Sequence, residues 1–191
     1  KTIEKAHVAN IVTATPDPAD IIGFERMVEH ITSGIGVTSC GFMGCWQTQL
    51  DARCPRPFIS SSLIDLPVWS QHHNSQNMAI VTFDAAALRS PYYADLLAGF
   101  NGQIIGLDPD MHLRKVIAED LPELDQDRAC GELIDLLKSY HVGEGIEALV
   151  LECTNLPPYK AAFKKHFDVT IYDIMTSLDA RDPKLINPRF L

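Results

Sequence analysis

The sequence predicts an α/β protein built on parallel β-sheets. Short apolar runs alternate with longer segments of helical periodicity along the chain, which is typical of βαβ units. Several of these runs are continuously apolar, such as Met78–Val81 and Ala148–Leu151, as expected for parallel strands covered on both faces. The chain has 191 residues, 46% hydrophobic and 21% charged, which is enough for a sizeable core.

The apolar runs set the strands that we expect, in chain order: 8–12, 35–38, 57–60, 78–83, 103–107, 147–152 and 169–174. Between them, spacing close to the helical period predicts helices at 17–31, 41–52, 91–100, 125–140 and 155–167. The last of these begins with Pro157 and Pro158, which the first turn of a helix tolerates. The segment 182–191 carries two further prolines, and its pattern leaves open whether it wraps over the body or starts another element.

Composition excludes several classes of protein. The formal net charge is −9, and the densest basic cluster, which ends in the sequence Lys164-Lys165-His166, has the spacing of a solvated helix face. We therefore expect no nucleic-acid partner. No apolar run approaches the ~18 residues of a membrane helix, so we expect no membrane partner. Five cysteines are widely spread without a CxxC pair, which favours a reducing, cytoplasmic compartment.

Two cysteines stand at matching junctions. Cys40 ends the strand-like run that starts at Gly36, and Cys153 ends the run that starts at Ala148; each precedes a helical segment. The carboxyl ends of strands in open α/β sheets face the ligand crevice. A following helix N-terminus lowers a thiol pKa and attracts anions, so the junctions predict an acid, a base and an anion site. The remaining cysteines lack this context, and we interpret them as packing residues: Cys45, Cys54 and Cys130.

The residues at these junctions resemble a known family. Segments Gly36–Phe42 and Leu151–Tyr159 look like the two signature regions of the aspartate/glutamate racemase superfamily, in its branch with a CGF and an ECTN motif. Segment Ser60–Leu63 resembles the same branch, and the element order agrees over nearly the whole chain. The resemblance implies two pseudo-symmetric α/β lobes with parallel sheets and an active site in the cleft between them. The first lobe would hold 1–75 and about 176–191, and the second 76–175.

The resemblance also implies a chemistry. The catalytic pair would be Cys40 and Cys153, one removing a proton next to a carboxylate and the other returning a proton to the opposite face. No pyridoxal phosphate, metal or other cofactor is implied, and the partners are a small carboxylate or amino-acid substrate and a second copy in a homodimer. The residues that would bind the substrate are Thr38, Ser39, Gly41, Phe42, Thr154 and Asn155. The resemblance therefore implies a cofactor-independent isomerase, a racemase or epimerase.

Two features depart from the family pattern. Classical members carry Asn-Thr after the first cysteine, where this chain has Gly41-Phe42, which predicts a more apolar pocket and leaves amino-acid substrates such as glutamate in question. Family members also begin with a further strand and a substrate-contacting loop. This chain starts without an initiator Met, inside a strand-like pattern, so we expect that strand to exist in the protein and to precede the sequence given.

Other functions stay open at this stage. The resemblance also covers decarboxylases, which keep one of the two cysteines, and cis–trans isomerases of small dicarboxylates. A non-catalytic metabolite-binding or redox-sensing protein is the alternative from another class. His72-His73 has no further ligand at metal-binding spacing, and Ser60–Ser62 is not part of a GxSxG elbow. Asp84 follows a strand and is best explained as a helix N-cap.

Overall fold

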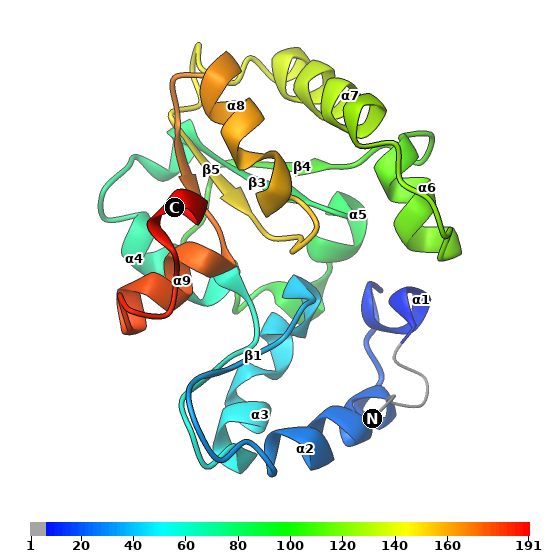
Figure 1. Cartoon of the computed structure of the whole chain (residues 1–191), viewed down its shortest axis with the longest axis vertical. Coiled ribbons are helices and arrows are strands. Elements are labelled where there is room, and N and C mark those ends of the chain that lie inside the picture. Colours follow the sequence, from blue (N-terminus) through cyan, green and yellow to red (C-terminus); the bar gives the residue numbers. More distant parts are fainter. Residues whose placement is uncertain (1–6) are drawn as a thin grey trace.

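The structure, a computed structural model, describes residues 7–191, and within them the strands form two parallel sheets (Figure 1). The smaller sheet pairs β1 (Gly36–Val37) with β2 (Phe58–Ile59). The larger sheet has the order β4-β3-β5-β6. Its strands are β3 (Met78–Thr82), β4 (Gln103–Gly106), β5 (Ala148–Leu151) and β6 (Thr170–Tyr172). The α/β class with parallel sheets is therefore confirmed.

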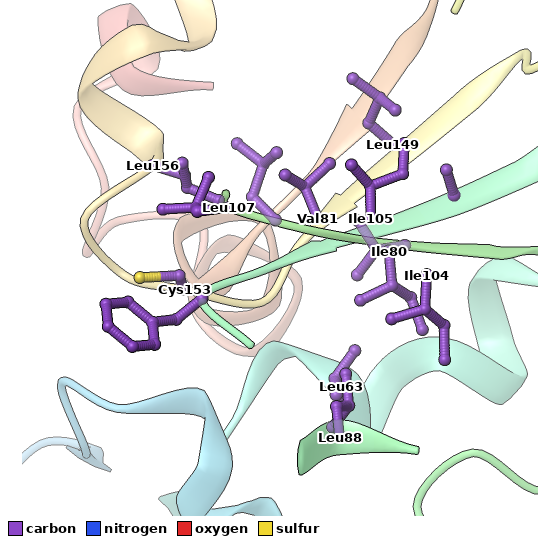
Figure 2. Close-up of a cluster of buried hydrophobic side chains, with 14 of the residues drawn as sticks. Leu63, Ile80, Val81, Leu88, Ile104, Ile105, Leu107, Leu149, Cys153 and Leu156 are labelled. Atoms are coloured by element: carbon purple, nitrogen blue, oxygen red, sulfur yellow. The ribbon is translucent and has the colours of Figure 1, made fainter. Parts of the chain in front are cut away.

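The two central strands of the larger sheet are buried along their whole length. Ile80 on β3 lies opposite Ile104 on β4 and Val150 on β5. Figure 2 shows their apolar side chains stacked on both faces of the sheet, with Cys153 at one end of the cluster. Strands covered on both faces bury continuous apolar runs, which explains why the sequence pattern identified them so clearly.

Helices cover the larger sheet. α7 (Gln126–Ser139) begins at Asp125, whose side chain accepts a hydrogen bond from the Arg128 amide, and packs against α8 (Lys160–His166). α9 (Ile174–Arg181) begins with a capping box between Asp173 and Thr176. Shorter helices complete this part of the chain: α4 (Leu66–Trp69), α5 (Ala85–Leu88) and α6 (His112–Glu119).

The smaller sheet is accompanied by α2 (Ile22–Val28) and α3 (Gln47–Arg53), which contact each other (Figure 1). Arg53 lies 3.2 Å from the carboxylate of Glu25, an ion pair that joins the two helices. α1 (Val8–Ile11) reaches across to contact α6 beside the larger sheet. The N-terminal segment therefore spans the space between the two sheets, where the candidate site lies.

Most predicted elements are present, and the errors have identifiable causes. The strand expected at 8–12 is wrong: this segment is α1, capped by the His7 side chain, and a short apolar run does not distinguish strand from helix. The helix expected at 91–100 is also wrong. Only a 3₁₀ turn forms at Pro91–Tyr93 and turns follow it to residue 99, although Tyr93, Leu96 and Leu97 pack against the core as the pattern predicted.

One strand boundary and two helices also differ from the prediction. The strand expected at 169–174 ends at Tyr172, because the capping box at Asp173 starts α9, a helix that the sequence did not predict. α6 was not predicted as a helix. The helices expected at 17–31, 41–52 and 155–167 are present, each beginning as a 3₁₀ turn, and α7 confirms the one expected at 125–140.

Candidate functional site

Cys40 lies just beyond the carboxyl end of β1, at the entrance to the 3₁₀ helix Gly41–Trp46. The hydroxyl of Thr38 fixes this turn, because it donates to the Ser60 carbonyl at 2.6 Å and to the Cys40 carbonyl at 3.0 Å. Ser60 follows β2, so the hydrogen bond joins the ends of both strands of the smaller sheet. The position of Cys40 is thus set by backbone contacts around it.

Cys153 lies at the corresponding place on the larger sheet, two residues after the end of β5. A turn follows, in which the Leu156 amide donates to the Cys153 carbonyl at 3.0 Å. The side-chain amide of Asn155 lies 3.8 Å from the Cys153 sulfur and donates to it. The following 3₁₀ turn starts only at Pro157, later than the sequence predicted, so Thr154 and Asn155 belong to the turn and face the site.

The two cysteines line one cavity of about 550 Å³. Its walls combine the segment after β1, the segment after β5 and apolar side chains of α1 and α2. Every residue that the resemblance marked as catalytic or substrate-binding lines this cavity: Thr38, Ser39, Cys40, Gly41, Phe42, Cys153, Thr154 and Asn155. The structure therefore brings together two motifs that are far apart in the chain, although their chemical roles remain proposals.

Direct hydrogen bonds join the two motif regions. The Thr154 hydroxyl donates to the Ser39 carbonyl, across 115 positions of sequence. The Ser62 hydroxyl donates to the Leu151 carbonyl at 3.1 Å, across 89 positions. Ser62 is fully buried, so the second contact holds the smaller sheet against β5 in the interior. These two contacts fix the relative position of the cysteines.

Both thiols are protonated in the ligand-free site, and the expectation of lowered pKa values is wrong. Burial and the nearby Glu152 carboxylate raise the pKa of Cys40 to about 12 and that of Cys153 to about 12. The predicted effect of the backbone amides exists, since Phe42 and Met43 lower the pKa of Cys40. Burial has the larger effect on the pKa, because transferring a thiolate out of water is less favourable than the two amide contacts are favourable.

Glu152 is the site residue that the sequence analysis missed. Its side chain is only 2% exposed, yet it lines the same cavity as the cysteines. The Thr82 hydroxyl donates to its Oε2 atom at 2.7 Å. Burial raises the pKa of Glu152 to about 7, against the lowering effect of the hydrogen bonds from Thr82 and the Phe83 amide. The signal was present, since an acid stands between an apolar strand and a motif cysteine.

The other candidate groups lie outside the cavity. Cys45 donates to the Phe42 carbonyl at 3.4 Å and burial raises its pKa to about 11, while Cys54 and Cys130 are half-buried. His73 is hydrogen-bonded to the Tyr172 hydroxyl at 3.0 Å, and Asp84 caps α5 as predicted. Over residues 7–191, no three potential metal ligands gather, and no helix has the length and apolar character needed to cross a membrane.

The fold is similar to that of several solved racemase structures. An aspartate racemase from Picrophilus torridus superimposes with a TM-score of 0.61 at 14% identity, covering 91% of this chain and 74% of that one. Glutamate racemase from Francisella tularensis, in complex with D-glutamate, gives 0.52 at 17% identity, covering 95% and 72%. The chain has the fold of the aspartate and glutamate racemases. Glutamate racemase RacE1 from Bacillus anthracis gives 0.52 at 18% identity, covering 78% and 56%.

Curated relatives add a second likeness. Dimethylsulfoniopropionate lyases 6 and 3 from Emiliania huxleyi are each 28% identical over 190 residues, covering 87% of this chain and 48% of the relative. The chain thus spans about half the length of the curated relatives it matches. No protein-family model matches it. The fold that the resemblance of the two cysteine motifs implied is therefore confirmed.

Proposed function

We propose that this protein is an enzyme that removes a proton from the carbon next to a carboxylate, using Cys40 and Cys153 without a cofactor. The observation that supports it is the convergence of the two cysteines, from the ends of strands in two different sheets, on one cavity. The two sheets would be the cores of two lobes related by pseudo-symmetry, with the active site between them. In that division Arg181, in the C-terminal segment, pairs with Asp65 of the first lobe at 2.7 Å.

The chemistry needs a thiolate on one face of the substrate carbon and a thiol on the other. A carbon acid next to a carboxylate is very weak, so the base must act in a dry site and the developing charge must be stabilised. The cavity walls are largely apolar, and amides at Phe42 and Asn155 already point at the sulfurs. These amides are available to stabilise negative charge on a sulfur or on a bound carboxylate.

Racemisation or epimerisation is the first candidate reaction. In it, the proton returns from the thiol opposite the one that became the base, so both cysteines are required. The racemase fold and the presence of both cysteines in one cavity favour this outcome. The substrate class would be a small carboxylate or amino acid that fits a cavity with mainly apolar walls.

Elimination is the second candidate, favoured by the curated relatives. Dimethylsulfoniopropionate carries a positively charged sulfonium group on the carbon beyond the one that loses its proton. Removing that proton would therefore expel dimethyl sulfide by the same first step. Phe42, Phe58 and Phe83 line the cavity, and aromatic faces attract methylated cations. The buried Glu152 carboxylate in the same wall would add to this attraction.

The test is solvent deuterium exchange by the full chain. Small amino acids, hydroxy acids and dimethylsulfoniopropionate are incubated in D₂O, with NMR for α-deuteration, chiral chromatography for racemisation and headspace analysis for dimethyl sulfide. Cys40→Ser and Cys153→Ser should each reduce exchange at least a hundredfold, while Cys54→Ser serves as the matched control. Exchange in both motif variants at the wild-type rate would contradict the proposal.

A further inference from the structure

Glu152 is a buried acid with one oxygen unused. Oε2 accepts the hydrogen bond from Thr82, whereas Oε1 is buried and, among the described residues, has no hydrogen-bond partner. No ion pair to Glu152 forms within residues 7–191 either. A buried carboxylate oxygen without a hydrogen-bond partner is destabilising, most of all when the group is charged. An unused oxygen in such a place is therefore suited to take up a proton.

The unused oxygen faces the first cysteine motif. A Cβ atom added to Gly41 would lie 2.1 Å from Glu152 Oε1 and 2.4 Å from the Glu152 carbonyl oxygen. The absence of a side chain at position 41 thus lets the carboxyl group approach the backbone directly after Cys40. Glu152 also precedes Cys153 in the chain, and its charge acts on both thiols.

Among the ionisable groups around the two thiols, Glu152 is the most acidic. No lysine, arginine or histidine lines the cavity among the described residues. Tyr93 and Cys45 face the same interior, and burial raises the pKa of both, so they are neutral at physiological pH. Arg114 lies over the Phe83 ring but is paired with Asp84 at 3.0 Å. Of the groups around the thiols, Glu152 is thus the one that loses its proton first.

We propose that Glu152 is the proton-accepting partner of the thiol pair, so that a thiolate forms at Cys40 or Cys153 when the thiol proton moves to Glu152. The inference rests on the proposed function. One thiol passes its proton to the carboxylate, and the resulting thiolate removes the substrate proton and becomes a thiol again. The opposite thiol gives its proton to the substrate carbon, or is not used in an elimination. In racemisation the carboxyl proton then returns to that second sulfur, so no proton is gained or lost.

Proton sharing of this kind has a distinctive pH dependence. Because burial raises the pKa of Glu152 to about 7, the thiolate population should rise with pH up to about that value. Above it, a thiolate can form at constant total charge by passing its proton to Glu152, so its population should level off. A second rise follows only when the thiols lose protons to solvent, toward their own pKa of about 12. Coupled groups titrate in such steps.

The experiment measures alkylation rates of the individual cysteines with iodoacetamide between pH 5 and 10, resolved by peptide mass spectrometry. Wild type should show the levelling near pH 7 at Cys40 and Cys153, and Cys54 should rise without it. Glu152→Gln should give one continuous rise, with alkylation several-fold faster than wild type at pH 9, because the negative charge that opposes the thiolate is gone. This readout needs no substrate.

Thr82→Val provides a second variant that leaves both thiols and the carboxyl in place. Losing the hydrogen bond that stabilises the charged carboxylate should raise the pKa of Glu152 and move the levelling point upward by about 0.7 pH unit. A wild-type profile without levelling, or levelling that persists in Glu152→Gln, overturns the inference. Coupled titration without deuterium exchange into any substrate would support the role of Glu152 while removing the proposed function.

Discussion

The buried carboxyl of Glu152 predicts how the stability of the fold depends on pH. Burial raises its pKa from 4.5 to about 7, so the folded chain binds this proton more tightly than the unfolded chain does. The stabilisation is fully present below pH 4.5, the unfolded value, and is lost as the pH rises through 7. The sign is opposite to that of a carboxylate held in an ion pair.

The magnitude follows from the two pKa values. A pKa difference of one corresponds to about 1.4 kcal/mol. Going from pH 5 to pH 8 should therefore remove about 2–3 kcal/mol from the free energy of unfolding through Glu152 alone. Glu152→Gln has no proton to lose, so its free energy of unfolding should fall by about 2–3 kcal/mol less than that of wild type over the same interval.

Urea unfolding followed by circular dichroism at pH 5 and pH 8 measures this difference. Comparing the two pH values within each protein cancels the cost of burying the new amide, which needs hydrogen-bond partners of its own. The exposed Glu123 supplies the matched control, and Glu123→Gln should keep the wild-type pH dependence. Equal pH dependence in wild type and Glu152→Gln, to within about 0.5 kcal/mol, would refute the assignment of a neutral buried carboxyl.

Two further substitutions test the packing around the site. Gly41→Ala should destabilise the fold by about 1–3 kcal/mol, because the new Cβ would lie 2.1 Å from Glu152. Gly131→Ala on α7 places its Cβ in open space and should stabilise the fold by about 1 kcal/mol. Urea unfolding compares the two variants. Lys160→Met should cost about 3–5 kcal/mol, because it leaves Asp173 buried without its ion pair at 3.2 Å. Adding Asp173→Asn should recover much of that loss in thermal unfolding, and full additivity of the two changes would contradict the ion-pair argument.

The sequence predicted the larger sheet well for a physical reason. Strands such as β3 and β5 bury every residue, so their apolar runs have no polar interruption. The helices were harder, since several begin as 3₁₀ turns and α1 has only four residues. A segment as short as Val8–Ile11 bears no periodicity that separates helix from strand, and the outcome depended on the His7 cap and on packing against α6.

The candidate site divides in the same way. Placing Cys40 and Cys153 at strand ends followed from local pattern, and the structure brings both to one cavity. Their protonation did not follow from pattern, because the pKa of a thiol depends on burial by residues that are distant in sequence. Glu152 was missed for a related reason: only the docking of β5 beside β3 shows that Thr82 and Gly41 enclose its carboxyl group.

The hydrogen bond from Thr154 to the Ser39 carbonyl has a mechanical consequence. It couples the loop after β5 to the loop after β1, while the Ser62 hydroxyl donates to the Leu151 carbonyl and so anchors the end of β5. Neither contact involves a cysteine, so the distance between the two sulfurs is held by neighbouring residues and not by the cysteines themselves. Substitutions on α1 and α2 can therefore change the shape of the opposite cavity wall, and with it the choice of substrate, without changing the distance between the sulfurs.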